Sequence, residues 1–415
     1  MSANATTPTR TALESRVVRA AIALLLVFGS VSISARTVQA SIVGRSDGND
    51  TSGPLDLAHV RVSHASRTAD SIQIRTISPF TNGEVDGKAG NFVGLFSIDG
   101  GRHLFRTLYV FYASGRMRGL LVNNFGSVES TLRAARVNAR TVRVLVPHAD
   151  MADKSYRIVL GSVWRGAPCS RKSPCVDWVP SHGSLLHDLV TPTAKWLHIP
   201  NPTSTEFQPS TGTTMTTHVQ FSASDDRYGS GLRRWILQWH MRGASVWQTA
   251  AKGTKKFPTV AITGEQGHTY VMRLTVVDRQ GNRATAEKMP WVDLPMDDRS
   301  ANFTYDGTWS QNTSPDWLLG TATAGANGAH LSVTGRAMSV CVLLEPTTGP
   351  AATATALLTD VDTSSTSGFN VPESGSTPHT AISCEGDQNA RHTWRLDITV
   401  TSDEPWIIDG VVFVG

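Results

Sequence analysis

The chain has 415 residues, with 38 basic and 34 acidic side chains and a formal net charge of +4 at pH 7. Its length predicts two to four domains, and a hydrophobic content of 40% is enough for buried cores. The first 40 residues carry a net charge of +3, so the rest of the chain is nearly neutral, which argues against nucleic acid or an anionic membrane as a partner.

The N-terminus has the pattern of a secretory signal peptide, which we predict over residues 1–40. Three arginines precede an uncharged run from Ala20 to Ala35, and small residues at Val38-Gln39-Ala40 suit a cleavage site. Cleavage after Ala35 or after Ala40 fits, as does a retained anchor, although 16 uncharged residues are fewer than the ~20 of a spanning helix. We expect a secreted, extracellular protein with no transmembrane span after cleavage.

The four cysteines of a secreted chain predict two disulfide bonds. Three pairings are possible on paper. Cys169 and Cys175 flank a short polar loop, whereas Cys341 and Cys384 fall in a later domain, so pairing within domains predicts Cys169–Cys175 and Cys341–Cys384. A zinc site is the rival reading, but the sequence contains no Cys-x-x-Cys.

Residues 41–54 are polar and rich in Gly, which predicts a flexible linker. Residues 55–198 follow with short apolar runs separated by turn residues, the pattern of a β-sandwich of about eight strands. The segment Asp177-Trp178-Val179-Pro180 closes this stretch. It resembles the end of an N-terminal β-sandwich module of secreted bacterial proteins, and that resemblance implies no activity.

The strand around Tyr270 identifies a second domain, predicted over residues 207–295. Tyr270, Met272, Leu274 and Val276 alternate with their neighbours, so one face of the strand is apolar, and Asp278-Arg-Gln-Gly-Asn282 follows as a turn. A Tyr at the start of such a strand fits a tyrosine corner. The pattern resembles bacterial Ig-like and fibronectin type III domains, which implies a spacer or an interaction module.

Residues 300–415 show alternating apolar strands again and predict a third sandwich. The opening Gly307-Thr-Trp309-Ser, the strand at His392-Thr393-Trp394 and the final Asp409-Gly410 resemble jelly-roll modules of secreted bacterial hydrolases and surface proteins. The chain departs from those modules at Thr359-Asp-Val-Asp362, where they often have an Asp-Gly hairpin. No ligand-binding face is therefore carried over from them.

Three carboxylates of the second domain are candidate metal ligands. Asp225, Asp226 and Asp278 lie in turns that can meet at one end of an Ig-like sandwich, and carboxylate oxygens could hold calcium there. The alternative is that they hydrogen-bond to their own turns beside Gly. No other cofactor is expected.

Two of the eleven tryptophans are candidate ligand contacts. Trp317 and Trp406 follow turn residues, so their rings could stack on sugars, whereas Trp309 and Trp394 lie in alternating strands and are predicted core residues. The match of Gly44-Arg-Ser-Asp-Gly48 to a nucleophile elbow lacks the strand and helix such an elbow needs. His pairs five residues apart, at 59 and 64 and at 182 and 187, are interpreted as solvated loop residues.

These patterns predict an all-β protein: a signal peptide followed by three β-sandwich domains. We expect a non-catalytic binding protein that contacts polysaccharide or other cell-surface and cell-wall components. One alternative is a hydrolase with its active site in residues 55–198, which would need two carboxylates about 5–10 Å apart in a cleft. The other is a structural spacer. The sequence does not identify the ligand.

Overall fold

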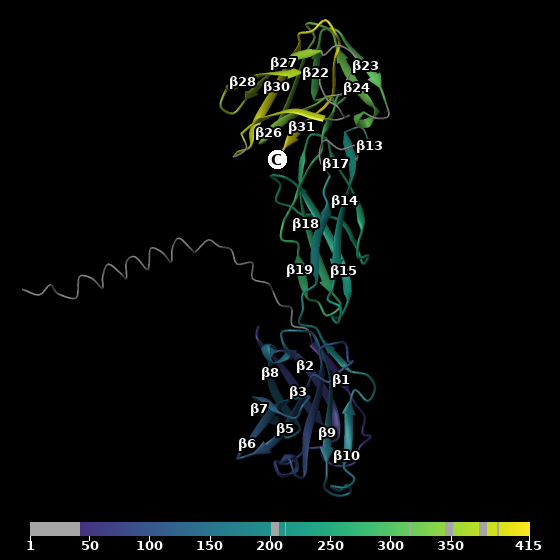
Figure 1. Cartoon of the computed structure of the whole chain (residues 1–415), viewed down its shortest axis with the longest axis vertical. Coiled ribbons are helices and arrows are strands. Elements are labelled where there is room, and N and C mark those ends of the chain that lie inside the picture. Colours follow the sequence, from purple (N-terminus) through teal and green to yellow (C-terminus); the bar gives the residue numbers. More distant parts are fainter. Residues whose placement is uncertain are drawn as a thin grey trace, which may run out of the picture. The chain divides into compact units, whose positions relative to one another are not determined.

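The computed structural model describes residues 42–200, 207–211, 213–314, 317–344, 352–372, 380–387 and 390–415. The predicted signal peptide, residues 1–40, lies outside these ranges. The described residues form β-strands joined by turns (Figure 1). Three short 3₁₀ helices lie between strands: η1 (Gly83–Val85), η2 (His148–Met151) and η3 (Leu318–Gly320). Within these ranges no helix is long and apolar enough to cross a membrane. The all-β prediction is confirmed.

The first eleven strands form one antiparallel sheet in the order β1-β2-β3-β8-β7-β6-β5-β4-β9-β10, with β11 also pairing with β9. Their bounds are β1 Ile42–Ser46, β2 Leu57–His64, β3 Ala69–Thr76, β4 Gly90–Ser97, β5 Arg106–Ala113, β6 Arg116–Asn123, β7 Val128–Asn138, β8 Thr141–Pro147, β9 Tyr156–Trp164, β10 Cys175–Val179 and β11 Leu185–His187. The alternating apolar residues of these strands share a single core that includes Val60, Ile72, Phe92 and Ile158.

Strand β7 joins the two halves of this sheet. Its residues Val128 to Arg133 pair with β6, and its residues Ala134 to Asn138 pair with β8. The sheet therefore folds over one core, and inward residues of β2, β3 and β8 contact those of β4, β5 and β9. Successive side chains of a strand point to opposite faces of the sheet, so the alternating apolar residues all lie on this inner face.

The expected flexible linker over residues 41–54 is not what the structure contains. Residues Ile42 to Ser46 form β1, which pairs with β2 from Ser63 to His59. The polar, Gly-rich composition described only the loop that follows. A short edge strand with the sequence Ile-Val-Gly-Arg-Ser gives too weak a signal to separate it from that loop.

The middle of the chain forms two sheets. The four-stranded sheet has the order β12-β14-β13 with β17 beside β14, and the five-stranded sheet has the order β16-β15-β18-β19 with β20 beside β18. The strands are β12 Thr193–His198, β13 Gln208–Thr211, β14 Thr214–Ser224, β15 Leu232–Met241, β16 Gln248–Gly253, β17 Thr259–Glu265, β18 Thr269–Asp278, β19 Arg283–Thr285 and β20 Trp291–Asp293. Strand β12, expected to end the first domain, pairs with β14.

The strand around Tyr270 has the predicted place and shape. It is β18, and its residues Tyr270, Met272, Leu274 and Val276 are all buried. The Tyr270 hydroxyl accepts a hydrogen bond from the backbone N–H of Glu265 at 2.8 Å, as expected of a tyrosine corner. The turn after β18 is closed by the Asp278 carboxylate, which accepts the N–H of Asn282 at 2.9 Å.

The last part of the chain is a sandwich of two sheets. One has the order β23-β24-β31-β26-β29 with β21 beside β31, and the other has the order β22-β25-β30-β27-β28. The strands are β21 Met296–Asp297, β22 Phe303–Asp306, β23 Trp309–Thr313, β24 Thr321–Gly325, β25 His330–Ala337, β26 Ser339–Leu344, β27 Thr353–Asp360, β28 Ser365–Pro372, β29 Thr380–Gly386, β30 His392–Val400 and β31 Trp406–Val414.

Both predicted disulfide pairings are present. Cys169–Cys175 closes the loop before β10, and Cys341–Cys384 joins the neighbouring strands β26 and β29, in which the two residues are directly paired. Within the described ranges no cysteine is free. Neither pair has the geometry of a zinc site, which settles the rival reading in favour of disulfides.

Candidate functional site

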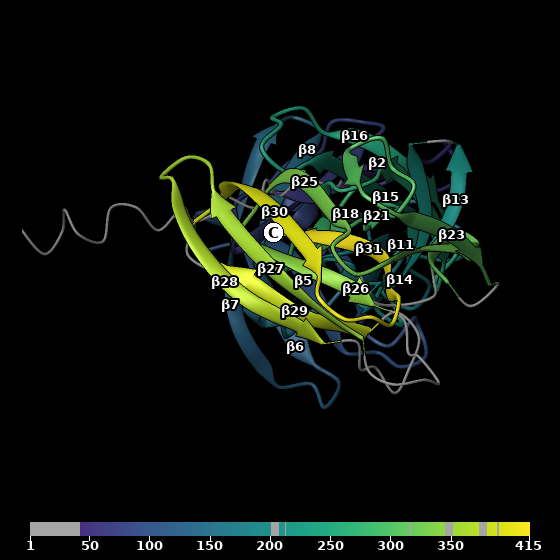
Figure 2. The ribbon, with the colours of Figure 1, turned by 90° about the horizontal axis from the view of Figure 1, so that it is seen from above.

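A groove crosses the outer face of the sheet β22-β25-β30-β27-β28. It has a volume of about 680 Å³. Strands β25, β30, β27 and β28, which supply its walls and floor, run side by side in Figure 2. Its polar lining residues come from all four strands: His330, Thr355, Asn370, Arg395, Asp397 and Thr399.

The strand register aligns these side chains in rows. Thr355 on β27 is paired with Thr399 on β30 and with Asn370 on β28, while Leu357 is paired with Asp397 and Gly368. Because side chains alternate between the faces of a sheet, the residues next to these, such as Ala356 and Ile398, point into the core.

The groove is hollow because one position in the second row has no side chain. A Cβ atom built on Gly368 would have no heavy atom closer than the Ala356 carbonyl oxygen at 3.9 Å, so the space above Gly368 is open. Leu357 beside it is 43% exposed and supplies an apolar floor. An apolar floor with polar walls is the usual composition of a small-molecule site.

Charged groups occupy one wall of the groove. Arg395 Nε lies 2.8 Å from Asp397 Oδ2, and His330 Nε2 lies 3.7 Å from Asp397 Oδ1. The pair leaves further guanidinium N–H groups of Arg395 and lone pairs of Asp397 free to turn toward a ligand. The wall can thus donate and accept hydrogen bonds within a few ångströms, as a ligand with many hydroxyl groups requires.

The two tryptophans expected to stack on sugars do not line this groove. Trp406 begins β31 and is fully buried in the core of the last sandwich, so its predicted stacking role is wrong. Glu404 and Pro405 do mark a loop, but Trp406, the first residue of the strand that follows, points into the core. Trp317 is half-buried at the start of η3, and no described groove includes it.

The three predicted calcium ligands do lie near one another. Oxygens of Asp225 and Asp278 lie within 4.8 Å of each other and of an oxygen of Asp188, a residue that follows β11. Asp226 is next to them, and a Cβ atom on Gly229 would touch carboxylate oxygens of Asp226, Asp225 and Asp188. Burial and then the charge of Asp188 raise the pKa of Asp225 to about 6.

The oxygens of this acidic group already accept hydrogen bonds. Asp225 accepts the backbone N–H groups of Asp226 and Gly231, and Asp278 accepts both the backbone and the side-chain N–H of Asn282. The alternative reading from sequence, turns closed by Asx hydrogen bonds, therefore describes the geometry, and calcium at this position stays a prediction. Sequence reasoning missed Asp188 because it is 37 residues from Asp225 along the chain.

A buried histidine cluster surrounds Asp70 in the first sheet. The same carboxylate oxygen of Asp70 lies 2.8 Å from His64 Nδ1, 3.0 Å from His148 Nε2 and 3.0 Å from His187 Nε2. The second oxygen accepts the Tyr156 hydroxyl at 2.8 Å. His187, expected in a solvated loop, is instead fully buried, and the side chain of His64, also expected in a loop, is only 8% exposed.

The chemistry of this cluster is that of a satisfied buried charge. Burial alone would raise the pKa of Asp70, but hydrogen bonds from His148, His187 and His64 outweigh it and hold that pKa far below its usual value. The hydrogen bond to Asp70 raises the pKa of His148. Because both oxygens of Asp70 are occupied and no groove described above or below is lined by these residues, the cluster stabilises the fold.

The first sheet was the expected location of a hydrolase active site in the alternative hypothesis. Three surface depressions on it are lined by basic and neutral side chains: one by Lys88, Arg165 and Arg171, one around Arg61, Arg75 and Arg140, and one around Leu95 and His103. None of the three is lined by a carboxylate. The pair of carboxylates that acid–base hydrolysis needs is thus missing from these depressions.

The sequence matches no protein-family model and no curated protein. Among solved structures, the chain is similar to carbohydrate-binding modules of the β-sandwich superfamily at 14% identity and a TM-score of 0.24, covering 54% of this chain and 96% of the module. It is similar to the exo-β-1,3-galactanase of Phanerochaete chrysosporium at 7% identity and a TM-score of 0.22, covering 90% of this chain and 95% of the galactanase.

A third similar structure is the FN1–FN3 segment of chicken CNTN1, at 9% identity and a TM-score of 0.19, with coverage of 86% of this chain and 97% of that segment. TM-scores this low carry no argument about what the chain does. The functional reading therefore depends on the groove and on the side chains that line it.

Proposed function

We propose that the chain is an exported, non-catalytic protein that binds glycan through the groove on β25, β30, β27 and β28. The observation that supports this proposal is the groove itself: an open hollow over Gly368 with an apolar floor and a wall of hydrogen-bonding groups around Asp397. Two disulfides fit an oxidising, extracellular compartment, where cell-wall and surface polysaccharides are available.

The groove suits a polyhydroxylated ligand better than an apolar or a strongly charged one. Its positive and negative groups are paired with each other, so the wall offers directional hydrogen bonds with little net charge. Hydrogen bonds that involve a charged group contribute roughly 1.5–3 kcal/mol each. Two or three such bonds give the modest affinity expected of a single groove on one sheet.

The proposal is tested by measuring binding of the purified chain to a panel of soluble polysaccharides and to isolated cell walls. Arg395→Ala and Asp397→Asn should each weaken binding by roughly 10- to 100-fold, the effect of losing one charge-assisted hydrogen bond. Arg283→Ala is the matched control, since Arg283 is an exposed strand arginine on a different sheet.

Equal binding by the wild type and both groove variants would remove the groove from the proposal. If no polysaccharide binds the wild type and one partner protein co-purifies with it, the chain is a spacer. Release of reducing sugar by the wild type during these assays would favour the hydrolase alternative.

A further inference from the structure

The loop between β1 and β2 brings three carboxylates to a fourth on β10. Oxygens of Asp47, Asp50 and Asp177 lie within 4.8 Å of one another. Asp56, at the end of the same loop, lies against the Asp177 carboxyl. We call Asp47, Asp50, Asp56 and Asp177 the Asp56 cluster. Asp47 and Asp50 lie in the segment expected to be a linker, and Asp177 is the Asp of the Asp-Trp-x-Pro motif.

The Asp56 cluster differs from the acidic group around Asp225 because both carboxylate oxygens of its most buried member, Asp56, lack a regular hydrogen bond. Asp56 is only 3% exposed, and the backbone N–H of Thr51 lies near its carboxyl, yet no described residue makes a hydrogen bond of regular geometry to either of its oxygens. The Oδ2 atom of Asp47 is likewise buried without a partner. One oxygen of Asp177 accepts the Leu57 N–H at 2.6 Å.

Among the residues that the structure describes, no positively charged side chain offsets these four carboxylates. Within the described residues, no Lys, Arg or His forms an ion pair with any member of the cluster. Burying a carboxylate costs several kcal/mol unless it is paired or coordinates a metal. Four carboxylates therefore meet here with no cation paired to them, and the cluster is electrostatically incomplete as it stands.

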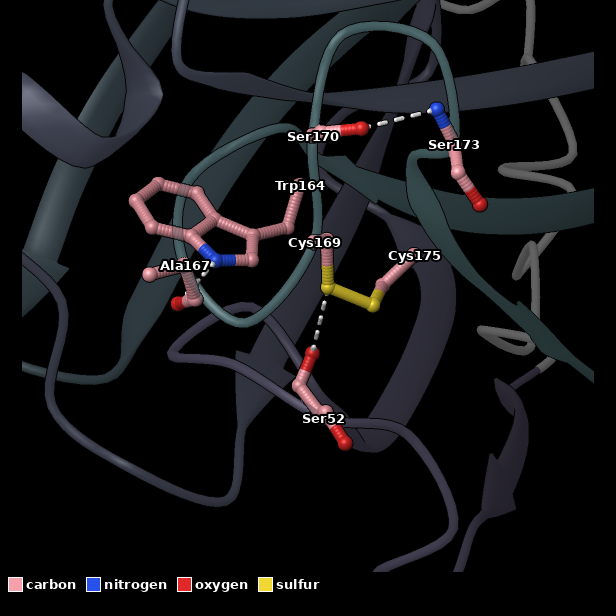
Figure 3. The surroundings of a disulfide bond; sticks show 7 residues. All are labelled: Ser52, Trp164, Ala167, Cys169, Ser170, Ser173 and Cys175. Carbon is pink, nitrogen blue, oxygen red and sulfur yellow. Dashed lines mark hydrogen bonds between the residues drawn. A yellow bond between two sulfur atoms is a disulfide. The ribbon is translucent and has the colours of Figure 1, made fainter.

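The loop is held in place by contacts that do not involve the carboxylates. Gly53 has a φ of +114° and packs on Trp164, where a Cβ atom would lie 2.5 Å from the indole Cδ1. Figure 3 shows the neighbouring contacts: Cys169 Sγ lies 3.8 Å from the Ser52 carbonyl oxygen, and Trp164 Nε1 donates to the Ala167 carbonyl at 3.2 Å. The Cys169–Cys175 disulfide thus contacts the loop at Ser52, and Cys175 is the first residue of β10, the strand that carries Asp177.

We propose that the Asp56 cluster is a calcium-binding site. All of its donors are oxygens, which Ca²⁺ takes in sets of six to eight with flexible geometry. The absence of His and Cys from the cluster disfavours zinc, and Mg²⁺ requires a stricter octahedral arrangement with several waters. Calcium would neutralise part of the negative charge and give the two Asp56 oxygens a partner.

The chief rival is a proton shared between Asp56 and Asp177, which would also relieve the repulsion. The two explanations differ in what they predict at neutral pH. A shared proton makes the loop insensitive to calcium. A calcium site makes the folded state bind the ion, so added calcium must raise the melting temperature of the protein.

The test uses the full secreted chain, without the glycan ligand. With about 10 mM calcium, above the 10⁻⁴–10⁻³ M dissociation constants of extracellular calcium modules, the melting temperature should rise by roughly 5 °C relative to EDTA. Terbium can replace calcium and emit light when an adjacent tryptophan is excited, so Trp164 beside the loop should sensitise its emission. Calcium, but not an equal concentration of magnesium, should displace the terbium.

Two variants locate the site. Asp56→Asn and Asp50→Asn should abolish the calcium-dependent rise and the terbium emission, while in EDTA they should melt at or above the wild-type temperature because each removes a like charge. A merely structural role for these residues would lower the melting temperature in both buffers. Asp50 is exposed, so its variant tests the site even where Asp56→Asn fails to fold. Asp153→Asn, an exposed substitution in the turn between η2 and β9, is the control.

The proposal is overturned if the wild type binds no calcium, or if Asp56→Asn and Asp50→Asn bind it as the wild type does. If calcium still binds to the Asp56→Asn and Asp50→Asn variants but not to Asp225→Asn, the ion belongs to the acidic group around Asp225 instead. Glycan binding in EDTA reports separately on the groove, so either proposal can fail without the other.

Discussion

The hydroxyl of Tyr270 accepts a hydrogen bond from the backbone N–H of Glu265, five residues earlier in the chain. Glu265 is the last residue of β17 and Tyr270 is the second of β18, so this bond ties together the two sheets of the middle sandwich at their connection. The ring of Tyr270 is itself buried and stacks on Trp239 with centroids 4.4 Å apart.

Replacing Tyr270 by Phe should keep the packed ring and lose only this bond. We expect the free energy of unfolding of the middle sandwich to fall by about 1–2 kcal/mol, because the Glu265 N–H is left without a partner. Scanning calorimetry measures the change. A loss below a few tenths of a kcal/mol would mean that water replaces the hydroxyl at no cost.

Removing the central carboxylate of the histidine cluster should be far more damaging. Asp70→Asn leaves three imidazoles around a neutral amide in a buried place, and breaking such a pair costs about 3–5 kcal/mol. Tyr156→Phe, which removes one hydrogen bond to the same carboxylate, is the comparison and should cost about 1–2 kcal/mol. Urea denaturation followed by the fluorescence of the first sheet ranks the two variants, and a reversed order would contradict the assigned role of Asp70.

The same cluster predicts a pH dependence of stability. The pKa of His148 is raised in the folded state by its hydrogen bond to Asp70. The stabilisation from His148 is therefore complete below the unfolded pKa of about 6.5 and is lost as the pH rises through the higher folded value. The wild type should lose stability as the pH rises above about 6.5, and His148→Gln should flatten that slope. Melting curves in calcium-free buffers across this range measure it.

Filling the groove should separate binding from stability. Gly368→Val places a β-branched side chain in a strand where the added Cβ meets no close atom, so the last sandwich should gain roughly 0.5–1 kcal/mol. The same side chain occupies the hollow and should abolish glycan binding. A variant that is both stabilised and able to bind would show that the ligand lies elsewhere.

The two disulfides should differ in what they contribute. Cys341–Cys384 closes a segment with a sequence separation of 43, and Cys169–Cys175 one of 6. Chain entropy alone assigns about 4 kcal/mol to the first and about 2 kcal/mol to the second. Chemical denaturation of a double alanine variant of each pair measures the two losses of stability. Calcium is left out, so that an effect on the loop beside Cys169 does not add to the loss measured for Cys169–Cys175.

The sequence was sufficient wherever a local pattern determines the structure. Alternation from Tyr270 to Val276 predicted a buried strand, and the tyrosine corner and the Asp278 turn followed from residues within a few positions of it. The disulfides were predictable because each pair falls within one run of strands. Such features depend on neighbours in the chain.

The remaining features depend on partners that are distant in sequence. Asp56 and Asp177 are 121 positions apart, and no spacing rule links a loop residue to a strand so far away. Trp406 was misplaced because a turn signal fixes where a strand begins but not which face its first residue takes. The groove was missed because its key position, Gly368, contributes no side chain to notice.

Strand β7 has a consequence for how the first sheet comes apart. Since its first half is hydrogen-bonded to β6 and its second half to β8, neither half of the sheet can open without removing a strand from the other. Loss of order there should be a single cooperative event. Amide protons on both sides of β7 should then exchange with solvent at one common slow rate, although they lie in strands as far apart in the chain as β2 and β9.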